Sequence, residues 1–77
     1  MTRRDFYRMI DEILEVEPGT ITGGEQLNAL EAWDSLSVLQ VIAAADKKLG
    51  VNLTAQQLAE CATVDAMLNL LAGRIED

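Results

Sequence analysis

The chain lacks histidine and contains a single cysteine, Cys61. One cysteine excludes an internal disulfide, which fits a reducing compartment such as the cytoplasm. Without histidine, neither the Cys61 thiol nor a serine hydroxyl has the usual general base for nucleophilic catalysis. Zinc sites need histidine or several cysteines, and no acidic calcium-loop pattern is present. We therefore expect a non-catalytic protein without a metal site, in which Cys61 is a small core residue.

Long apolar runs are also missing, since none approaches the ~20 residues that a membrane span requires. The basic N-terminus is followed by Phe6-Tyr7-Arg8 and not by an apolar signal core. Seventy-seven residues that are 49% hydrophobic and 25% charged are typical of one globular domain. We expect a single domain over residues 1–77 that is cytoplasmic, monomeric and not bound to a membrane.

Cations are scarce, because six Lys and Arg stand against 13 Asp and Glu, for a net charge of −7. Between Met9 and Asp46 every charged residue is acidic: Asp11, Glu12, Glu15, Glu17, Glu25, Glu31, Asp34 and Asp46. Such a surface repels nucleic acid and attracts basic patches on proteins. Solubility alone is an equally good explanation of the charge. No nucleic-acid partner is expected.

Apolar residues at helical spacing predict an all-α fold of three main helices and one short helix. The first helix has Phe6, Ile10, Ile13 and Leu14 on one face, Thr2 as its N-cap, and Pro18-Gly19 as its stop. The last begins after the N-cap Thr63, with Val64, Met67, Leu68, Leu71 and Ile75 on one face. A capping box at Thr54 and Gln57 predicts the short helix at about 55–60.

The connection at about 16–33 is long for so small a domain, and connections of that length are often functional. Ile21, Leu27 and Leu30 are its expected anchors in the core, and residues 25–30 are expected to form a helical turn. Its glycines do not match a phosphate-binding loop, because no Lys-Ser or Lys-Thr follows them.

The middle helix, expected at 35–49 with Gly50 as its stop, has two apolar faces. Val38, Val41, Ile42, Ala45 and Leu49 form one broad stripe that can pack on a core. Leu36, Leu39 and Ala43 project from nearly the opposite side. Either this helix is enclosed by the others, or the second face contacts a partner protein. We favour partner contact, because so few helices can hardly enclose one of their number.

Ser35 stands where the polar connection gives way to the middle helix. A serine at that position is a common N-cap, and this is its expected structural role. An N-cap hydroxyl is nevertheless at the surface, and a phosphate ester on it would lie at the positive end of the helix dipole. Self-catalysis by Ser35 is not expected, since no base is available to activate it.

Asp34-Ser35-Leu36 at the start of an amphipathic helix resembles the phosphopantetheine attachment motif of acyl carrier proteins. The resemblance covers nearly the whole chain, including the long loop, Leu49-Gly50-Val51 and Thr63-Val64. It implies that a magnesium-dependent phosphopantetheinyl transferase moves 4′-phosphopantetheine from coenzyme A to Ser35, and that the arm then carries acyl groups as thioesters. Enzymes of fatty-acid, polyketide or related biosynthesis would load and process them. The resemblance assigns partner recognition to Asp34, Leu36, Leu39 and Ala43.

The chain departs from the fatty-acid members of this family at several positions. Bulky Trp33 replaces a small residue, and Ser37, Gln40, Lys47 and Lys48 replace acidic residues of the helix. With these differences the chain resembles carriers of specialised pathways more than the fatty-acid carrier. Trp33 itself is expected to anchor the loop against the core. An aminoacyl or peptidyl carrier would use the same attachment chemistry. A helical interaction module without a prosthetic group is the alternative from another class.

Overall fold

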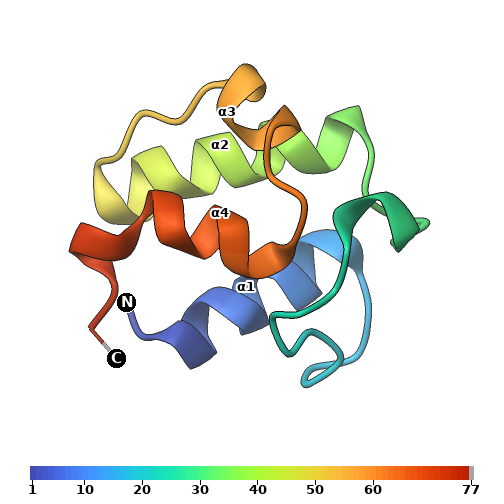
Figure 1. The fold of residues 1–77 in the computed structure, drawn as a ribbon. Helices are drawn as coiled ribbons and strands as arrows, with labels where there is room; N and C mark the ends of the chain where they lie inside the picture. The colour runs from blue at the N-terminus through green and yellow to red at the C-terminus, as the bar shows by residue number, and fades with distance from the viewer. Residues whose placement is uncertain (77) are drawn as a thin grey trace.

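The computed structural model describes residues 1–76 and is all-helical within them. Its four α-helices are α1 (Arg3–Leu14), α2 (Ser35–Leu49), α3 (Ala55–Ala59) and α4 (Val64–Leu70). Two 3₁₀ turns, Leu27–Ala29 and Ala72–Arg74, lie in the long connection and after α4 respectively. Figure 1 shows α1 and α3 on opposite sides of the molecule, with α2 beside α3. The expected bundle of three main helices and a short one is confirmed.

The helix starts follow from local capping chemistry. Thr2, Thr54 and Thr63 are the N-caps of α1, α3 and α4, and each threonine hydroxyl accepts a hydrogen bond from a backbone N–H of the first turn. Thr2 and Thr54 form complete capping boxes with Asp5 and Gln57. These three starts were predicted from the sequence.

Two helix ends differ from the sequence prediction. The first helix ends at Leu14 because Glu15 adopts a left-handed conformation (φ 58°), so the chain turns before Pro18 is reached. The last α-helix ends at Leu70 and continues as a 3₁₀ turn, so Ile75 lies beyond it. Ile75 is nevertheless half-buried and packs on the core.

The core is built from every helix and from the long connection. Its buried side chains are Phe6, Met9, Ile10, Leu14, Ile21, Leu27, Val41, Ala45, Leu53, Leu58, Val64, Met67, Leu68 and Leu71. The expected anchors Ile21 and Leu27 are 3% and 4% exposed, and Leu30 packs on the core from its edge. Cys61 is also only partly buried against this core. The predicted helical turn at 25–30 is the 3₁₀ turn Leu27–Ala29.

A buried carboxylate fixes the start of the long connection. Asp11 is 1% exposed, and its two oxygens accept hydrogen bonds from the backbone N–H groups of Gly19 and Ile21, both at 2.9 Å. A buried carboxylate is stable when its lone pairs are satisfied in this way. Asp11 therefore holds the turn that inserts Ile21 into the core. The prediction that Asp11 belongs to the acidic surface is wrong, because the loop folds over its carboxylate.

The middle of this connection is tied to α4. The N–H groups of Val64 and Asp65 donate to the carbonyls of Glu25 and Gly23 at 3.1 and 3.0 Å. The Tyr7 hydroxyl donates to the Asp65 carboxylate at 2.5 Å, which links α1 to the same corner. Gly23 is buried with φ +115°, and an added Cβ would collide with Tyr7 and Asp65. The loop is thus held at its start and in its middle, which fixes the direction in which it delivers the chain to α2.

Candidate functional site at the start of helix α2

The first turn of α2 is capped by Asp34 and not by Ser35. The Asp34 carboxylate accepts the backbone N–H of Ser37 at 3.0 Å and the Ser37 hydroxyl at 3.2 Å. The interpretation of Ser35 as the N-cap is therefore wrong by one residue. Aspartate and serine are similarly good caps, and the path of the incoming chain decides between them. Ser35 becomes the first helical residue instead.

Ser37 holds that path in place. Its side chain is only 4% exposed, and its hydroxyl donates to the carbonyl of Ala32 at 2.8 Å. The same side chain contacts the Asp34 carboxylate, so Ser37 joins the last loop residues to the first helical turn. The backbone N–H of Trp33 also donates to the carbonyl of Leu30 at 3.1 Å. These contacts orient the helix start and leave the Ser35 side chain outside the network.

Ser35 is exposed to solvent. Among residues 1–76 its hydroxyl has no hydrogen-bond partner, so no local structure competes for it. Beside it, the backbone N–H of Ser37 holds the pKa of the Asp34 carboxyl below its usual range. Asp34 is therefore ionised at neutral pH. Because its carboxylate already accepts the capping hydrogen bonds from Ser37, it is poorly placed to take a proton from Ser35.

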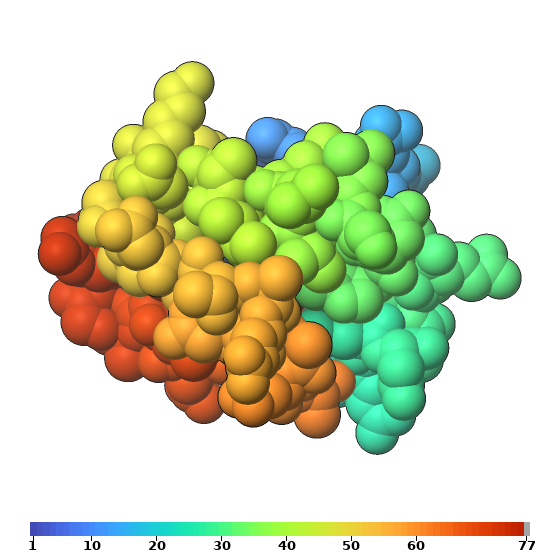
Figure 2. Space-filling view, turned by 90° about the horizontal axis from the view of Figure 1, so that it is seen from above, coloured from blue at the N-terminus to red at the C-terminus, as the bar shows by residue number. Residues whose placement is uncertain are grey.

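An apolar groove of about 350 Å³ adjoins Ser35. It is lined by Trp33, Ser35, Val38 and Leu39 on one side and by Ala55, Leu58 and Ala59 of α3 on the other. Leu58 is 1% exposed and belongs to the core. Ala55 and Ala59 have short side chains, so α3 fills little of the groove. Figure 2 shows this face of the molecule, with α2 and α3 side by side. None of these seven described residues is a histidine or carboxylate that could act as a general base.

Trp33 contacts both the core and the groove. It packs on the core from the loop, as expected for an anchor, and it also forms a wall of the groove. Only the first role was predicted from the sequence, because α3 approaches Trp33 through the tertiary fold. The groove as a whole was not predicted for the same reason.

The second apolar face of α2 is open to solvent. Leu36 and Leu39 are 63% and 61% exposed, and Ala43 is exposed on the same helix. Val41 and Ala45, on the other face, are at most 1% exposed. The alternative in which this helix is enclosed on both sides is therefore wrong. Large apolar side chains that stay exposed together are typical of protein contact surfaces.

Comparison with known proteins identifies the family. The chain matches the family model described as the phosphopantetheine attachment site over residues 4–71. The chain belongs to this family of phosphopantetheine carriers. It is 34% identical over 69 residues to a non-reducing polyketide synthase, ausA, of Aspergillus calidoustus. Those residues are 90% of this chain and 3% of the synthase, so the chain spans a very small part of that relative. No solved structure shows a significant match.

Membership defines the general function of the chain. The family is characterised by covalent attachment of 4′-phosphopantetheine, and this chain is a carrier protein with that prosthetic group as its cofactor. Carrier domains of the family are generally non-catalytic and interact with modifying and processing enzymes. The similarity to a polyketide synthase agrees with a carrier of a specialised pathway.

Three further findings concern the rest of the molecule. Within residues 1–76, no cluster of three or more potential metal ligands was found. In the same part of the chain, no helix has the length and apolar character that crossing a membrane requires. Cys61 has a raised thiol pKa, because burial disfavours the thiolate and the Glu60 carboxylate adds to the effect. A raised pKa keeps the Cys61 thiol protonated at neutral pH, and a protonated thiol is a weak nucleophile.

Proposed function

We propose that Ser35 is the residue that carries the 4′-phosphopantetheine arm. A separate phosphopantetheinyl transferase attaches the arm, and the chain itself contributes no catalysis. The observation that carries this proposal is that two different residues cap α2 and present a free hydroxyl at its start. Asp34 caps the helix, so the neighbouring Ser35 hydroxyl is exposed and can be esterified without loss of a structural hydrogen bond. An attachment residue needs this accessibility.

The surroundings of Ser35 fit a phosphodiester followed by an apolar cargo. The N-terminus of α2, a helix of 15 residues, carries a partial positive charge that favours an anionic ester. The groove between α2 and α3 provides apolar surface beside the same hydroxyl. When bound, the arm supplies a thiol that holds acyl groups as thioesters. Trp33 and Leu58 can then shield part of an acyl group from water.

Partner enzymes are expected to bind over the exposed end of α2. Asp34 remains partly available at the surface, and Leu36, Leu39 and Ala43 form an apolar contact face next to Ser35. This face holds few carboxylates beyond Asp34, so contacts with loading and processing enzymes rest more on apolar burial than on charge. We propose a monomer, since the net charge of −7 makes two copies repel each other.

Intact-mass measurement after incubation with coenzyme A, magnesium and a broad-specificity transferase tests the attachment residue. The native chain is expected to gain the mass of one arm, and Ser35→Ala is expected to gain none. Ser37→Ala is the matched control, because Ser37 is a serine two positions away whose hydroxyl is buried and already bonded. A native chain that several active transferases leave unmodified would contradict the proposal, as would mass gain in Ser35→Ala.

Trp33 provides an independent readout of the groove. It is the only tryptophan of the chain, so tryptophan emission reports this position alone. Loading the attached arm with an acyl group is expected to shift the emission of Trp33 to shorter wavelength, because the cargo displaces water from the indole. Loading with acetyl and with a longer acyl group compares a cargo too short to cover the indole with one that can. Equal emission from both would show that the groove is not used.

A further inference from the structure

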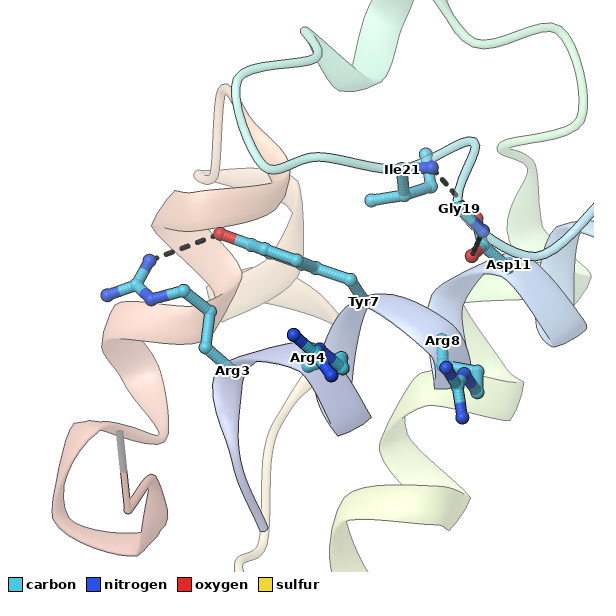
Figure 3. Close-up of a pocket in the computed structure, with 7 residues that line it drawn as sticks. All are labelled: Arg3, Arg4, Tyr7, Arg8, Asp11, Gly19 and Ile21. Carbon is cyan, nitrogen blue, oxygen red and sulfur yellow. Dashed lines mark hydrogen bonds between the residues drawn. The ribbon is translucent and has the colours of Figure 1, made fainter.

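Three of the six cations of this acidic chain lie on one helix and line one hollow. Arg3, Arg4 and Arg8 of α1 surround a cavity of about 450 Å³, which is completed by Tyr7, Asp11, Gly19 and Ile21. Figure 3 shows Arg3, Arg4 and Arg8 spaced along α1, with Arg3 reaching toward the Tyr7 hydroxyl and with Gly19 and Ile21 in the loop beside Asp11. We call these three side chains the arginine surface. Neither the attachment of the arm nor the contact face of α2 uses it.

The position of these charges is unfavourable for α1 itself. Arg3 and Arg4 stand in the first turn, where the helix dipole favours acids, and the last turn contains no basic residue. Arg4 and Arg8 are four residues apart, a spacing at which like charges destabilise a helix. Among residues 1–76 neither of them forms a salt bridge, whereas Arg3 lies 3.5 Å from the Asp65 carboxylate. Helix stability therefore does not explain Arg3 and Arg4, whereas Arg8 lies at a favourable helical spacing from Asp5 and Glu12.

The hollow is formed before any partner arrives. Its inner wall is fixed by Asp11, whose two oxygens accept hydrogen bonds from loop N–H groups, and this one carboxylate offsets only part of the charge of the three arginines. The Tyr7 hydroxyl on the other wall donates to Asp65 and accepts a hydrogen bond from Arg3 at 3.1 Å. A site whose walls are already ordered loses little entropy on binding.

We propose that the arginine surface binds an acidic segment of a partner protein. A second copy of this chain is a poor candidate, because each copy carries −7 and the two would repel. Nucleic acid is disfavoured by the same charge. A short segment that presents two carboxylates avoids most of this repulsion. The Cβ atoms of Arg4 and Arg8 are about 5–6 Å apart on the helix. Alternate residues of an extended segment are about 6.5 Å apart along the chain, so two of its carboxylates can face the two arginines.

The arginine surface lies away from the groove. The groove is bounded by α2 and α3, and α1 occupies the opposite side of the molecule from α3 (Figure 1). An acidic segment bound to α1 therefore leaves Ser35 accessible to an enzyme. Such a contact would keep the carrier near its partner while the contact face of α2 is used by one enzyme after another.

The test is a titration of the ¹⁵N-labelled chain with a hexapeptide of alternating glutamate and leucine at low salt. We expect amide signals at residues 4–8 and 19–21 to shift, and the affinity to fall as salt is raised. The double substitution Arg4→Gln, Arg8→Gln is expected to weaken binding about tenfold, the effect of losing two exposed charge pairs. Lys47→Gln, Arg74→Gln removes the same charge at two residues that do not line this hollow and is expected to change the affinity less than about twofold.

Several outcomes would overturn the proposal. One is equal loss of affinity in the two double variants, which would indicate an effect of net charge alone. Another is equally strong binding of a peptide with glutamine in place of glutamate. A third is binding of inorganic pyrophosphate at least as tight as that of the peptide, which would make the hollow a small-anion site. Ser35→Ala is expected to bind the peptide like the native chain, so this result is independent of the attachment residue.

Discussion

Replacement of Ser35 by alanine is expected to abolish attachment of the arm without lowering the stability of the fold. The structural reason is that the cap of α2 is the Asp34 carboxylate, so the substitution removes no capping hydrogen bond. Alanine has a higher helix propensity than serine, by roughly 0.5 kcal/mol in a helix interior. We therefore expect the free energy of unfolding to stay the same or rise by up to about 0.5 kcal/mol.

Thr63→Ala provides the matched comparison. The Thr63 hydroxyl accepts the backbone N–H of Ala66 at 3.1 Å and is the N-cap of α4. Loss of such a cap costs about 1 kcal/mol, within a range of about 0.5–2. For a small domain with a urea m-value of about 1 kcal/mol/M, this lowers the midpoint of unfolding by about 1 M. Ser35→Ala should leave the midpoint unchanged or raise it slightly.

The assay is urea unfolding of both variants followed by far-UV circular dichroism, with intact mass measured on the same samples after transferase treatment. Thr63→Ala is expected to be less stable and still to accept the arm, while Ser35→Ala is expected to be stable and unmodified. If Ser35→Ala loses as much stability as Thr63→Ala, its hydroxyl is a structural cap after all. The reasoning from the Asp34 cap would then be refuted.

Three further perturbations test other parts of the structure. Leu39→Asp is expected to leave the unfolding midpoint nearly unchanged, because the side chain is 61% exposed. The same substitution is expected to slow transfer of the arm or its cargo by partner enzymes. Normal transfer kinetics would exclude a role of Leu39 in recognition. Gly23→Ala is expected to destabilise the chain by more than about 1 kcal/mol, since a left-handed φ and the crowding by Tyr7 and Asp65 both oppose a Cβ; an unchanged thermal midpoint would contradict this. Because the pKa of Asp34 is lowered in the fold, its stabilising effect is present above the unfolded pKa and is lost as pH falls through the folded pKa. Asp34→Asn, which keeps a capping side chain, should therefore be less sensitive to acid than the native chain in urea unfolding between pH 7 and pH 3, and identical pH profiles would argue against the ionised cap.

Features that depend on neighbouring residues were determined by the sequence alone. Thr54 and Thr63 cap helices through bonds that span three residues, and Gly50 ends α2 through its own left-handed backbone. The helical period likewise places Leu36 and Leu39 away from Val41, whatever surrounds the helix. The exposed contact face of α2 could therefore be predicted from the spacing of its apolar residues.

The tertiary structure decided the features that depend on residues far apart in the chain. Asp34 and Ser35 are equally suitable caps locally, and the long connection, held by backbone bonds between Gly23 or Glu25 and α4, delivers the chain along the path that makes Asp34 the cap. The groove exists because α3 brings Leu58 against Trp33, and no spacing within either segment predicts that contact. Burial likewise converts Asp11 from a surface charge into the acceptor that fixes the loop. Local geometry thus fixed the helices and the place of Ser35 at the start of α2, whereas long-range packing created the surfaces around it.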